Sequence, residues 1–212
     1  MKRKQQKQAV ERVIGKGPVR YTQPGGTGSP LAISIDFRYA KPPEAYAYAD
    51  CVSVKNDPEV GMATILLGHA DTQAGKVKDC ISIVLPSAAL LIQFLSTTTS
   101  VEETLRAQLN TMGMSVAKRA VGKEAELRAS LFANVLALHT GPGDSSLDFY
   151  YLPVRDIHLA KEFQTEIPLE QVIRIVMPLP VLQYFFELCR SLAQSLQPAA
   201  QTVRTTNRVT AS

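Results

Sequence analysis

The chain has 212 residues, a formal net charge of +4 and 45% hydrophobic residues. This composition predicts a folded protein of one large or two small domains and excludes wholesale disorder. No apolar run approaches the ~20 residues that span a bilayer, and the basic N-terminus is not followed by the apolar segment of a signal peptide. We therefore expect a cytoplasmic protein with no membrane role. The wide spacing of Cys51, Cys80 and Cys189 favours reduced, buried thiols over disulfides or a zinc site.

The positive charge lies at the two ends of the chain. Lys2, Arg3, Lys4 and Lys7 precede the first acidic residue, and the last sixteen residues add two arginines and no acid. Between Tyr21 and Leu196, Asp and Glu outnumber Lys and Arg. Tethered cations raise encounter rates with polyanions and bind phosphates in a salt-dependent way. The tails, and not the folded body, are therefore the predicted electrostatic contact.

Residues 1–30 are predicted to form a flexible basic arm, because Gln23–Pro30 is rich in Gly and Pro. Order is expected to begin with a half-buried strand at Ala32–Tyr39, where Ile33, Ile35, Phe37 and Tyr39 alternate with smaller or polar residues.

The next unit, residues 31–112, continues with three strands and a helix. The strands are expected at Tyr48–Val54, Ala63–Leu67 and Cys80–Leu85, with a loop at Gly68–Asp79. Pro86 is expected at the junction with the helix, because proline cannot donate to a central strand but suits a helix start.

A polar helix and a linker are predicted between the two copies. Ser100–Glu103 matches a capping box that opens a helix running to about Met112. The linker is expected at residues 113–128.

Residues 129–197 repeat the same order of elements, and residues 198–212 are expected to be a disordered tail. The second copy has strands at Phe132–Leu138, Leu147–Leu152 and Val172–Met177, then Pro178 and an apolar helix. The fold class predicted is α+β: two tandem antiparallel sheets, each with a helix on one face, related by pseudo-twofold symmetry.

Two short motifs recur in both copies. Tyr48-Ala-Asp50 matches Phe132-Ala-Asn134, and Ile81–Pro86 matches Ile173–Pro178. In these motifs the chain resembles a short prokaryotic family catalogued as domain of unknown function 3467, over about Tyr48 to Leu196. At the level of topology the predicted units are also similar to the Whirly and PUR single-strand binders and to the chaperone SecB. The resemblance implies a bacterial protein and supplies no catalytic residue and no ligand.

No pattern of catalytic, metal-binding or cofactor-binding residues is present in the sequence. There is no Gly-x-Ser-x-Gly elbow, and His69, His139 and His158 lack metal-ligand spacing. Gly141–Asp144 lacks the Lys-Ser/Thr ending of a phosphate loop and predicts a hairpin turn. Asp50 and Asn134 are expected to bond local backbone. We predict that the chain is not an enzyme and needs no cofactor.

Aromatic and basic residues are interleaved near the first strands of both copies. Such mixtures form stacking platforms for single-stranded nucleic acid, although packing in the core is the commoner fate of aromatic residues in strands. The residues predicted to contact nucleic acid are Lys2, Arg3, Lys4, Lys7, Arg38, Lys41, Tyr46, Tyr150 and Arg155.

Two functional hypotheses follow. The first is a non-enzymatic protein that binds single-stranded nucleic acid through its basic arm and aromatic strands. The alternative is a protein-assembly, adaptor or chaperone-like module without a nucleic-acid role. A homo-oligomer is expected, because the apolar stripe of Val181–Leu192 is wide enough to cover two surfaces.

Overall fold

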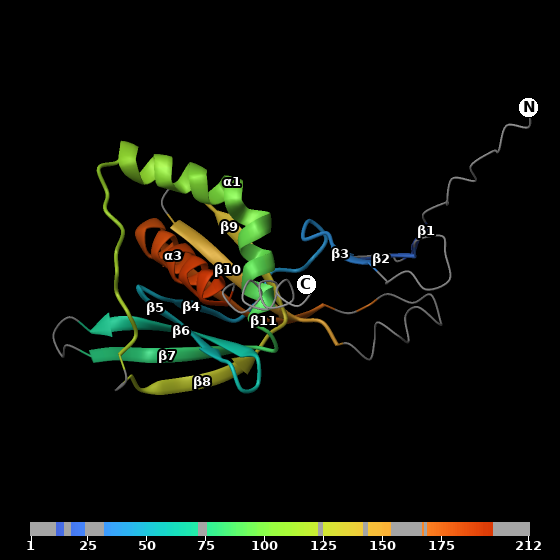
Figure 1. Cartoon of the computed structure of the whole chain (residues 1–212), viewed down its shortest axis with the longest axis horizontal. Helices are drawn as coiled ribbons and strands as arrows, with labels where there is room; N and C mark the ends of the chain where they lie inside the picture. The colour runs from blue at the N-terminus through green and yellow to red at the C-terminus, as the bar shows by residue number, and fades with distance from the viewer. Residues whose placement is uncertain are drawn as a thin grey trace, which may run out of the picture. The chain divides into compact units, whose positions relative to one another are not determined.

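The computed structural model describes residues 12–14, 18–23, 32–71, 76–122, 125–141, 144–153, 167 and 169–196. The chain divides into two compact units. Within the described residues, the first unit holds a three-stranded sheet, and the second holds two four-stranded sheets with the helices α1 and α3 (Figure 1). The predicted α+β class is confirmed.

The first unit contains β1 (Arg12–Ile14), β2 (Val19–Gln23) and β3 (Ala32–Ile35), paired antiparallel in the order β1-β2-β3. Two of these strands lie in the segment predicted to be a flexible arm.

The strand predicted at Ala32–Tyr39 ends four residues early. The Asp36 carboxylate accepts a hydrogen bond from the backbone N–H of Arg38 at 3.2 Å, and the Tyr39 N–H donates to the Asp36 carbonyl at 3.1 Å. An aspartate that bonds the backbone two residues on stabilises a turn. The expectation that Phe37 and Tyr39 continue the strand was therefore wrong.

One sheet of the second unit contains β5 (Cys51–Asp57), β6 (Met62–Asp71), β7 (Lys76–Leu85) and β8 (Leu127–Phe132), in the order β5-β6-β7-β8. The first three strands are antiparallel neighbours, and β8 is parallel to β7. β6 and β7 extend well into the predicted loop at residues 68–79.

The other sheet contains β4 (Tyr46–Tyr48), β9 (Val135–Thr140), β10 (Asp144–Tyr151) and β11 (Glu170–Pro178), in the order β4-β11-β10-β9. β10 and β9 are antiparallel, whereas β4 is parallel to β11. Both sheets are mixed, so the prediction of antiparallel sheets was wrong. Parallel neighbours need a long crossover connection, and α1 with the segment after it supplies one between β7 and β8.

The chain passes from one sheet to the other within the Tyr48-Ala-Asp50 motif. The Ala49 N–H donates to the Val176 carbonyl at 2.9 Å, in the sheet of β4, and the Asp50 N–H donates to the Gly68 carbonyl at 3.0 Å, in the sheet of β5. The strand predicted at Tyr48–Val54 is therefore two strands that belong to different sheets.

The Phe132-Ala-Asn134 motif makes the reverse passage. The Ala133 N–H donates to the Val84 carbonyl at 3.0 Å, and the Asn134 N–H donates to the Tyr150 carbonyl at 3.1 Å. Ala49 and Ala133 are 1% and 0% exposed. A small side chain is needed at each crossing, because both sheets and the helices close on this point.

The two helices follow the two prolines, as predicted. α1 (Ala89–Thr111) begins shortly after Pro86, and α3 (Leu179–Leu196) begins directly after Pro178. Neither described helix is long and apolar enough to cross a bilayer.

The separate polar helix predicted from Ser100 is instead the second half of α1. The hydroxyls of Thr98 and Thr99 donate to the carbonyls of Phe94 and Leu95, so these residues continue the helix and do not cap a new one. Glu102 is buried and bonded to Arg190 of α3 and Arg106 of α1. The carboxylate that suggested a capping box therefore joins two helices.

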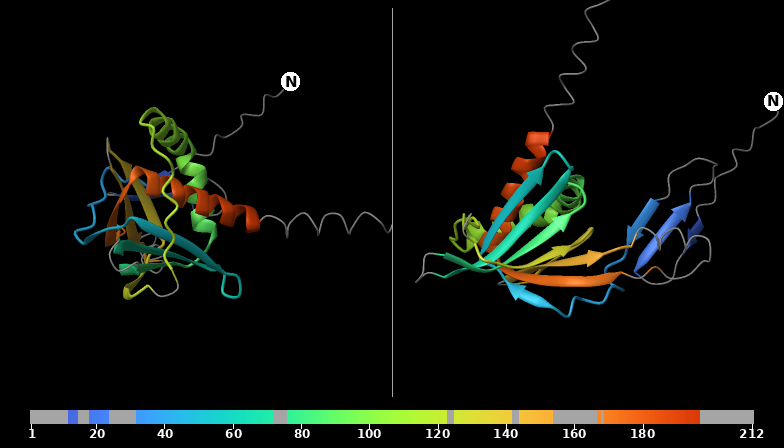
Figure 2. Two further views of the ribbon diagram at one scale, coloured as in Figure 1. Left: turned by 90° about the vertical axis from the view of Figure 1, so that its left-hand side faces the viewer. Right: turned by 90° about the horizontal axis from the view of Figure 1, so that it is seen from below.

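One large hydrophobic core holds the second unit together. Side chains from both sheets and both helices belong to it, and Phe94 of α1 stacks on Phe186 of α3 with ring centroids 5.9 Å apart. Figure 2 (left) shows α1 and α3 above the strands β5 to β8. The two predicted copies thus share one core.

Candidate functional site

Two exposed tyrosines lie on the outer face of the sheet β4-β11-β10-β9. Ile173, Ile175 and Met177 of β11 point into the core, so Arg174 and Val176 point outward. Tyr46 pairs with Arg174 and Tyr48 pairs with Val176 in the parallel register, which places both rings on the same outward face. Tyr46 is 79% exposed and Tyr48 is 51% exposed. We call the surface formed by Tyr46, Tyr48, Arg174 and His139 the tyrosine face.

An ionic cluster around a buried carboxylate lies on the same side of the sheet. Asp148 of β10 is 0% exposed and accepts two hydrogen bonds from Arg174 of β11, each 2.6 Å long. His139 Nε2 of β9 lies 3.1 Å from Asp148 Oδ2, and the Tyr150 hydroxyl donates to the same oxygen at 3.3 Å. Three strands of the sheet therefore meet at one carboxylate.

A second aspartate cluster borders the crossing between the sheets. Asp50 accepts a hydrogen bond from the Ala70 N–H at 2.7 Å, so its side chain bonds the backbone of β6 and not the local turn that we expected. Its Oδ2 lies 3.2 Å from His69 Nδ1 and 3.6 Å from a guanidinium nitrogen of Arg119. The His69 ring contacts Tyr48 edge to face, with centroids 5.7 Å apart. Tyr48, in the sheet of β4, is thus contacted by His69 from the sheet of β6.

The pKa shifts at these clusters follow from burial and from the neighbouring aspartates. Burial, followed by the charge of Asp148, raises the pKa of Tyr150 to about 12, and the hydrogen bond to Asp148 raises the pKa of Arg174. Burial, then the neighbouring Asp50, raises the pKa of Cys51 to about 11. A phenol and a thiol with raised pKa values stay protonated at neutral pH, which makes both poor nucleophiles.

The predicted contact residues differ in their exposure and in whether the structure describes them. Lys2, Arg3, Lys4, Lys7 and Arg155 lie outside the described residues. Arg38 and Lys41 are exposed in the first unit, where Arg38 forms an ion pair with Asp36 at 2.7 Å. In the second unit, Tyr46 is exposed, as a base-stacking residue must be.

Tyr150 does not meet the requirement for a contact residue. Its ring is 2% exposed, and its hydroxyl is bonded to Asp148. Strand alternation puts Tyr150 on the same face as Asp148, and its hydroxyl completes the ionic cluster. Tyr150 is therefore a supporting residue, and its predicted contact with an unpaired strand is corrected.

Sequence reasoning missed Arg174 and Asp148 as parts of the site, and it placed Tyr48 in the candidate aromatic stretch without counting it among the contact residues. A signal for the ion pair was present: one acid interrupts the apolar strand Leu147–Leu152, and one base interrupts the apolar strand Val172–Met177. Opposite charges in two buried strands indicate that the strands are neighbours, because an unpaired buried charge is costly.

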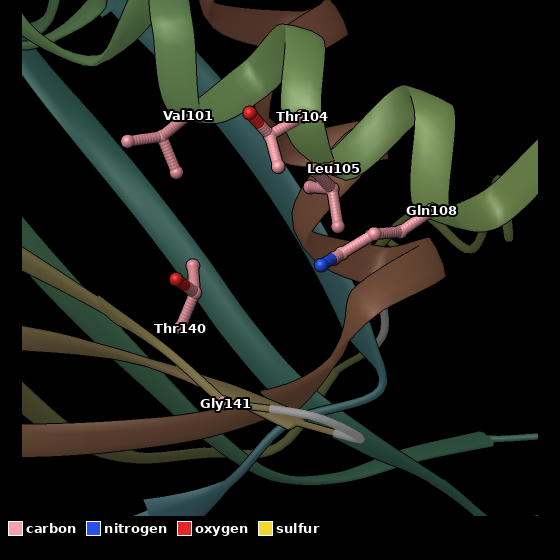
Figure 3. Close-up of a pocket in the computed structure, with 6 residues that line it drawn as sticks. All are labelled: Val101, Thr104, Leu105, Gln108, Thr140 and Gly141. Atoms are coloured by element: carbon pink, nitrogen blue, oxygen red, sulfur yellow. The ribbon is translucent and has the colours of Figure 1, made fainter.

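The structure also has a pocket of about 380 Å³ between α1 and the end of β9 (Figure 3). The described residues that line it are uncharged, namely Val101, Thr104, Leu105, Gln108, Thr140 and Gly141. None of these side chains supplies an acid, a base or a charged ligand. Within the described part of the chain, no group of three or more His, Cys, Asp or Glu side chains is placed to hold a metal ion.

Comparisons with family models, with curated proteins and with solved structures give no match to this chain. The resemblance to the family of unknown function, read from the two recurring motifs, stays a prediction.

Proposed function

We propose that this chain is a non-enzymatic protein that binds single-stranded nucleic acid by stacking bases on Tyr46 and Tyr48. The observation that carries the proposal is the exposure of both rings on one face of β4. Exposed aromatic rings in a row form the stacking platforms of single-strand binders, and each stacked base contributes about 1–3 kcal/mol.

The ionic cluster gives this platform a rigid support. Arg174 is fixed to Asp148 beside Tyr46, and its side chain remains 31% exposed. Since Asp148 neutralises most of its charge, Arg174 serves mainly to position the sheet and to offer remaining N–H donors to a phosphate or base.

Most of the phosphate affinity is assigned to the tails. Acids outnumber bases in the chain between Tyr21 and Leu196, so the folded body is a poor polyanion binder by charge alone. Lys2, Arg3, Lys4 and Lys7 supply four cations, and Arg38 and Lys41 add two at the end of the first unit. In this proposal the sheet stacks the bases, and the arm binds the phosphates.

We also propose that the two halves are copies related by a pseudo-twofold axis. In support, β8 joins the sheet of β5, β6 and β7 just as β4 joins the sheet of β9, β10 and β11. The matching backbone hydrogen bonds at Ala49 and Ala133 support the same proposal. The cytoplasmic location and the absence of an enzymatic activity stay predictions.

Fluorescence anisotropy with labelled single strands tests the proposed function. Replacing both tyrosines, Tyr46→Ala with Tyr48→Ala, should weaken binding at least tenfold, because two stacking contacts of about 1–3 kcal/mol each are lost. Tyr39→Ala is the matched control: it removes another exposed tyrosine, 60% exposed, from the first unit. It should leave the affinity within twofold.

The salt dependence of binding tests the role of the arm. Deleting residues 1–10 should reduce the slope of log K against log salt by up to about 3, since each neutralised phosphate of a single strand contributes about 0.7. Absence of binding by the intact chain at low salt would refute the proposal. Equal losses for the double variant and Tyr39→Ala would refute the tyrosine face as the contact.

A further inference from the structure

We propose that a second pocket, between α1, the segment after it and α3, binds a free α-amino acid with an apolar side chain. This inference goes beyond nucleic-acid binding and uses a different surface. The pocket has a volume of about 300 Å³. Its lining includes Arg106 and Leu109 of α1, Met114 and Val116 of the segment after α1, and Gln183 and Glu187 of α3.

Gln183 supplies the observation that points to a ligand. Its side chain is 1% exposed, and its Oε1 atom is buried and accepts no hydrogen bond from the described residues. Buried amide oxygens are nearly always bonded, because an unpaired acceptor gives up its hydrogen bonds with water and gains none in return. Since Gln183 lines the pocket, a bound molecule with an N–H donor can satisfy this oxygen.

Glu102 fixes the orientation of the Gln183 amide. Gln183 Nε2 lies 3.4 Å from Glu102 Oε1, and the same oxygen accepts hydrogen bonds from Arg106 and Arg190. Burial raises the pKa of Glu102, but the hydrogen bonds and charges of its partners outweigh burial and lower it. Glu102 is therefore a carboxylate, which only accepts hydrogen bonds. A flipped amide would place two acceptors together, so Oε1 must be the atom that faces away from Glu102.

Glu187 adds a negative charge one helical turn from Gln183. Residues four apart lie on the same face of a helix, and both of these line the pocket. Lys118 Nζ lies 3.6 Å from Glu187 Oε2, which is too long for a hydrogen bond, and the charge of Glu187 also acts on Arg190, whose guanidinium donates to Glu102. Glu187 thus keeps oxygens that can accept from an ammonium group, which has three N–H donors.

Arg106 supplies the opposite charge. Its Nη2 atom donates to Glu102 at 2.9 Å, and its side chain is 54% exposed. A guanidinium has five N–H donors, so this bond leaves others for a second carboxylate. Because Arg106 and Arg190 share the single carboxylate of Glu102, positive charge remains beside the pocket. A molecule that carries an ammonium group and a carboxylate on one carbon matches both kinds of charge.

Apolar side chains complete the lining. Leu109 is 2% exposed, and Met114, with its adaptable thioether side chain, is 47% exposed. The Ala117 N–H donates to the Pro180 carbonyl at 3.2 Å, which holds the segment after α1 against the start of α3. Figure 1 shows this segment leaving the end of α1. A volume of about 300 Å³ is at the lower end for small-molecule sites, which suits a ligand as small as one amino acid.

Isothermal titration calorimetry of the full chain at two temperatures, with L-leucine, L-methionine and L-phenylalanine, tests the proposal. At least one of them should bind with a dissociation constant in the millimolar range or below. For the amino acid that binds best, the corresponding amine lacks the carboxylate and the deaminated acid lacks the ammonium group. Each analogue should bind at least tenfold more weakly, because each loses a charge-assisted contact.

Three variants locate the site. Gln183→Met keeps the size of the side chain but removes the unpaired acceptor, and it should weaken binding at least tenfold. Glu187→Gln removes the charge from a side chain that is only 33% exposed, should also weaken binding at least tenfold, and keeps the test decisive if Gln183→Met fails to fold. Glu59→Gln makes the same charge change at an exposed position between β5 and β6 and should leave the affinity within twofold.

Two results would overturn the proposal: no binding of any of the three amino acids at millimolar concentration, or folded Gln183→Met and Glu187→Gln variants that bind as tightly as Glu59→Gln. Single-strand binding should be the same in Glu187→Gln and wild type, since Glu187 is not part of the tyrosine face. Failure of amino-acid binding is therefore distinguishable from failure of the proposed function.

Discussion

The two four-stranded sheets of the second unit share an architecture but differ in what covers their outer faces. Each has three strands from one half of the chain and one parallel strand from the other half. On the sheet of β5 to β8, the segment after α1 lies over the outer face, where Val121 packs on Cys51 and Cys80. On the sheet of β4 and β9 to β11, Tyr46 and Tyr48 are exposed.

This difference shows how one scaffold gives outer faces with different local cover. Where the segment after α1 lies, the outer face has two thiols, which a strand of chain can shield. At β4, the outer face of the other sheet has two large amphipathic rings, which tolerate water at the hydroxyl. The connection between the halves therefore decides that Cys51 and Cys80 are covered.

The two sheets can also be compared through their aspartate clusters. Replacing the buried aspartate of one sheet should have the largest effect on the free energy of unfolding. Asp148→Ala should lower the free energy of unfolding by about 3 kcal/mol, because it leaves the guanidinium of Arg174 without its buried partner. The value is at the low end for buried pairs, since Arg174 is 31% exposed. Urea denaturation at neutral pH measures it.

The matching change in the other sheet should cost less. Asp50→Ala leaves the Ala70 N–H without its acceptor but frees His69 and Arg119, whose side chains are 51% and 55% exposed and regain water. We expect a loss of about 1–2 kcal/mol. The double variant Asp148→Ala with Arg174→Met should recover part of the Asp148→Ala loss, and equal losses for the two aspartates would break the comparison.

The crossing points should respond alike, unlike the outer faces. Ala49→Leu and Ala133→Leu each force a larger side chain into a fully buried position and should each lower the free energy of unfolding by about 1–3 kcal/mol. Ala45→Leu, at an exposed position before β4, is the matched control and should change it by less than about 0.5 kcal/mol. Thermal or urea unfolding of the three variants gives the comparison; a tolerant Ala133 beside a sensitive Ala49 would contradict equivalent crossings.

Alkaline titration should show that Tyr150, unlike the exposed Tyr46 and Tyr48 of the same sheet, is buried. The pKa of Tyr150 is raised from 10.0 to about 12 in the folded protein, so the folded state holds the proton more tightly. The stability from this group is fully present below pH 10 and is lost as the pH rises toward 12. Tyr150→Phe should flatten this part of the stability profile, as measured by urea unfolding at a series of alkaline pH values. An unchanged slope in the variant would refute the assignment.

The covering segment itself gives the smallest predicted change in global stability. Val121→Gly should lower the free energy of unfolding by about 1 kcal/mol and raise the alkylation rates of Cys51 and Cys80 several-fold, because the segment opens locally. Cys189 lies on the core-facing side of α3 and should be unaffected. Mass spectrometry of the alkylated protein measures each site, with Ala120→Gly, at an exposed neighbour, as the control.

Much of the local structure was predictable because its causes are local. Strand alternation located β6, β7, β10 and β11, and the prolines located the starts of both helices, since proline ends a ladder wherever the chain folds. The recurrence of the aromatic-Ala-Asx motif was also visible. Its role was not, because a strand that changes sheets in its middle has the same alternation as one that does not.

The candidate site was predictable only in part for the same reason. Exposure of Tyr46 and burial of Tyr150 are opposite outcomes for the same residue type in two strands with aromatic neighbours. Tyr46 lies on a short edge strand, whereas Tyr150 lies on an inner strand beside the Asp148 cluster. Sequence periodicity gives a residue's face but not which strand lies beside it.

By itself, the sequence determined the α+β class, two recurring motifs, a basic N-terminal segment and an acidic excess between Tyr21 and Leu196, because these properties follow from periodicity, turn residues and the placement of charge. Only the tertiary structure decided that the halves exchange strands, that one core serves both sheets, and that the segment after α1 covers Cys51 and Cys80 while Tyr46 and Tyr48 are exposed. These features depend on pairing between residues far apart in the chain. Such pairing is selected by the packing of the whole core, and no local pattern encodes it.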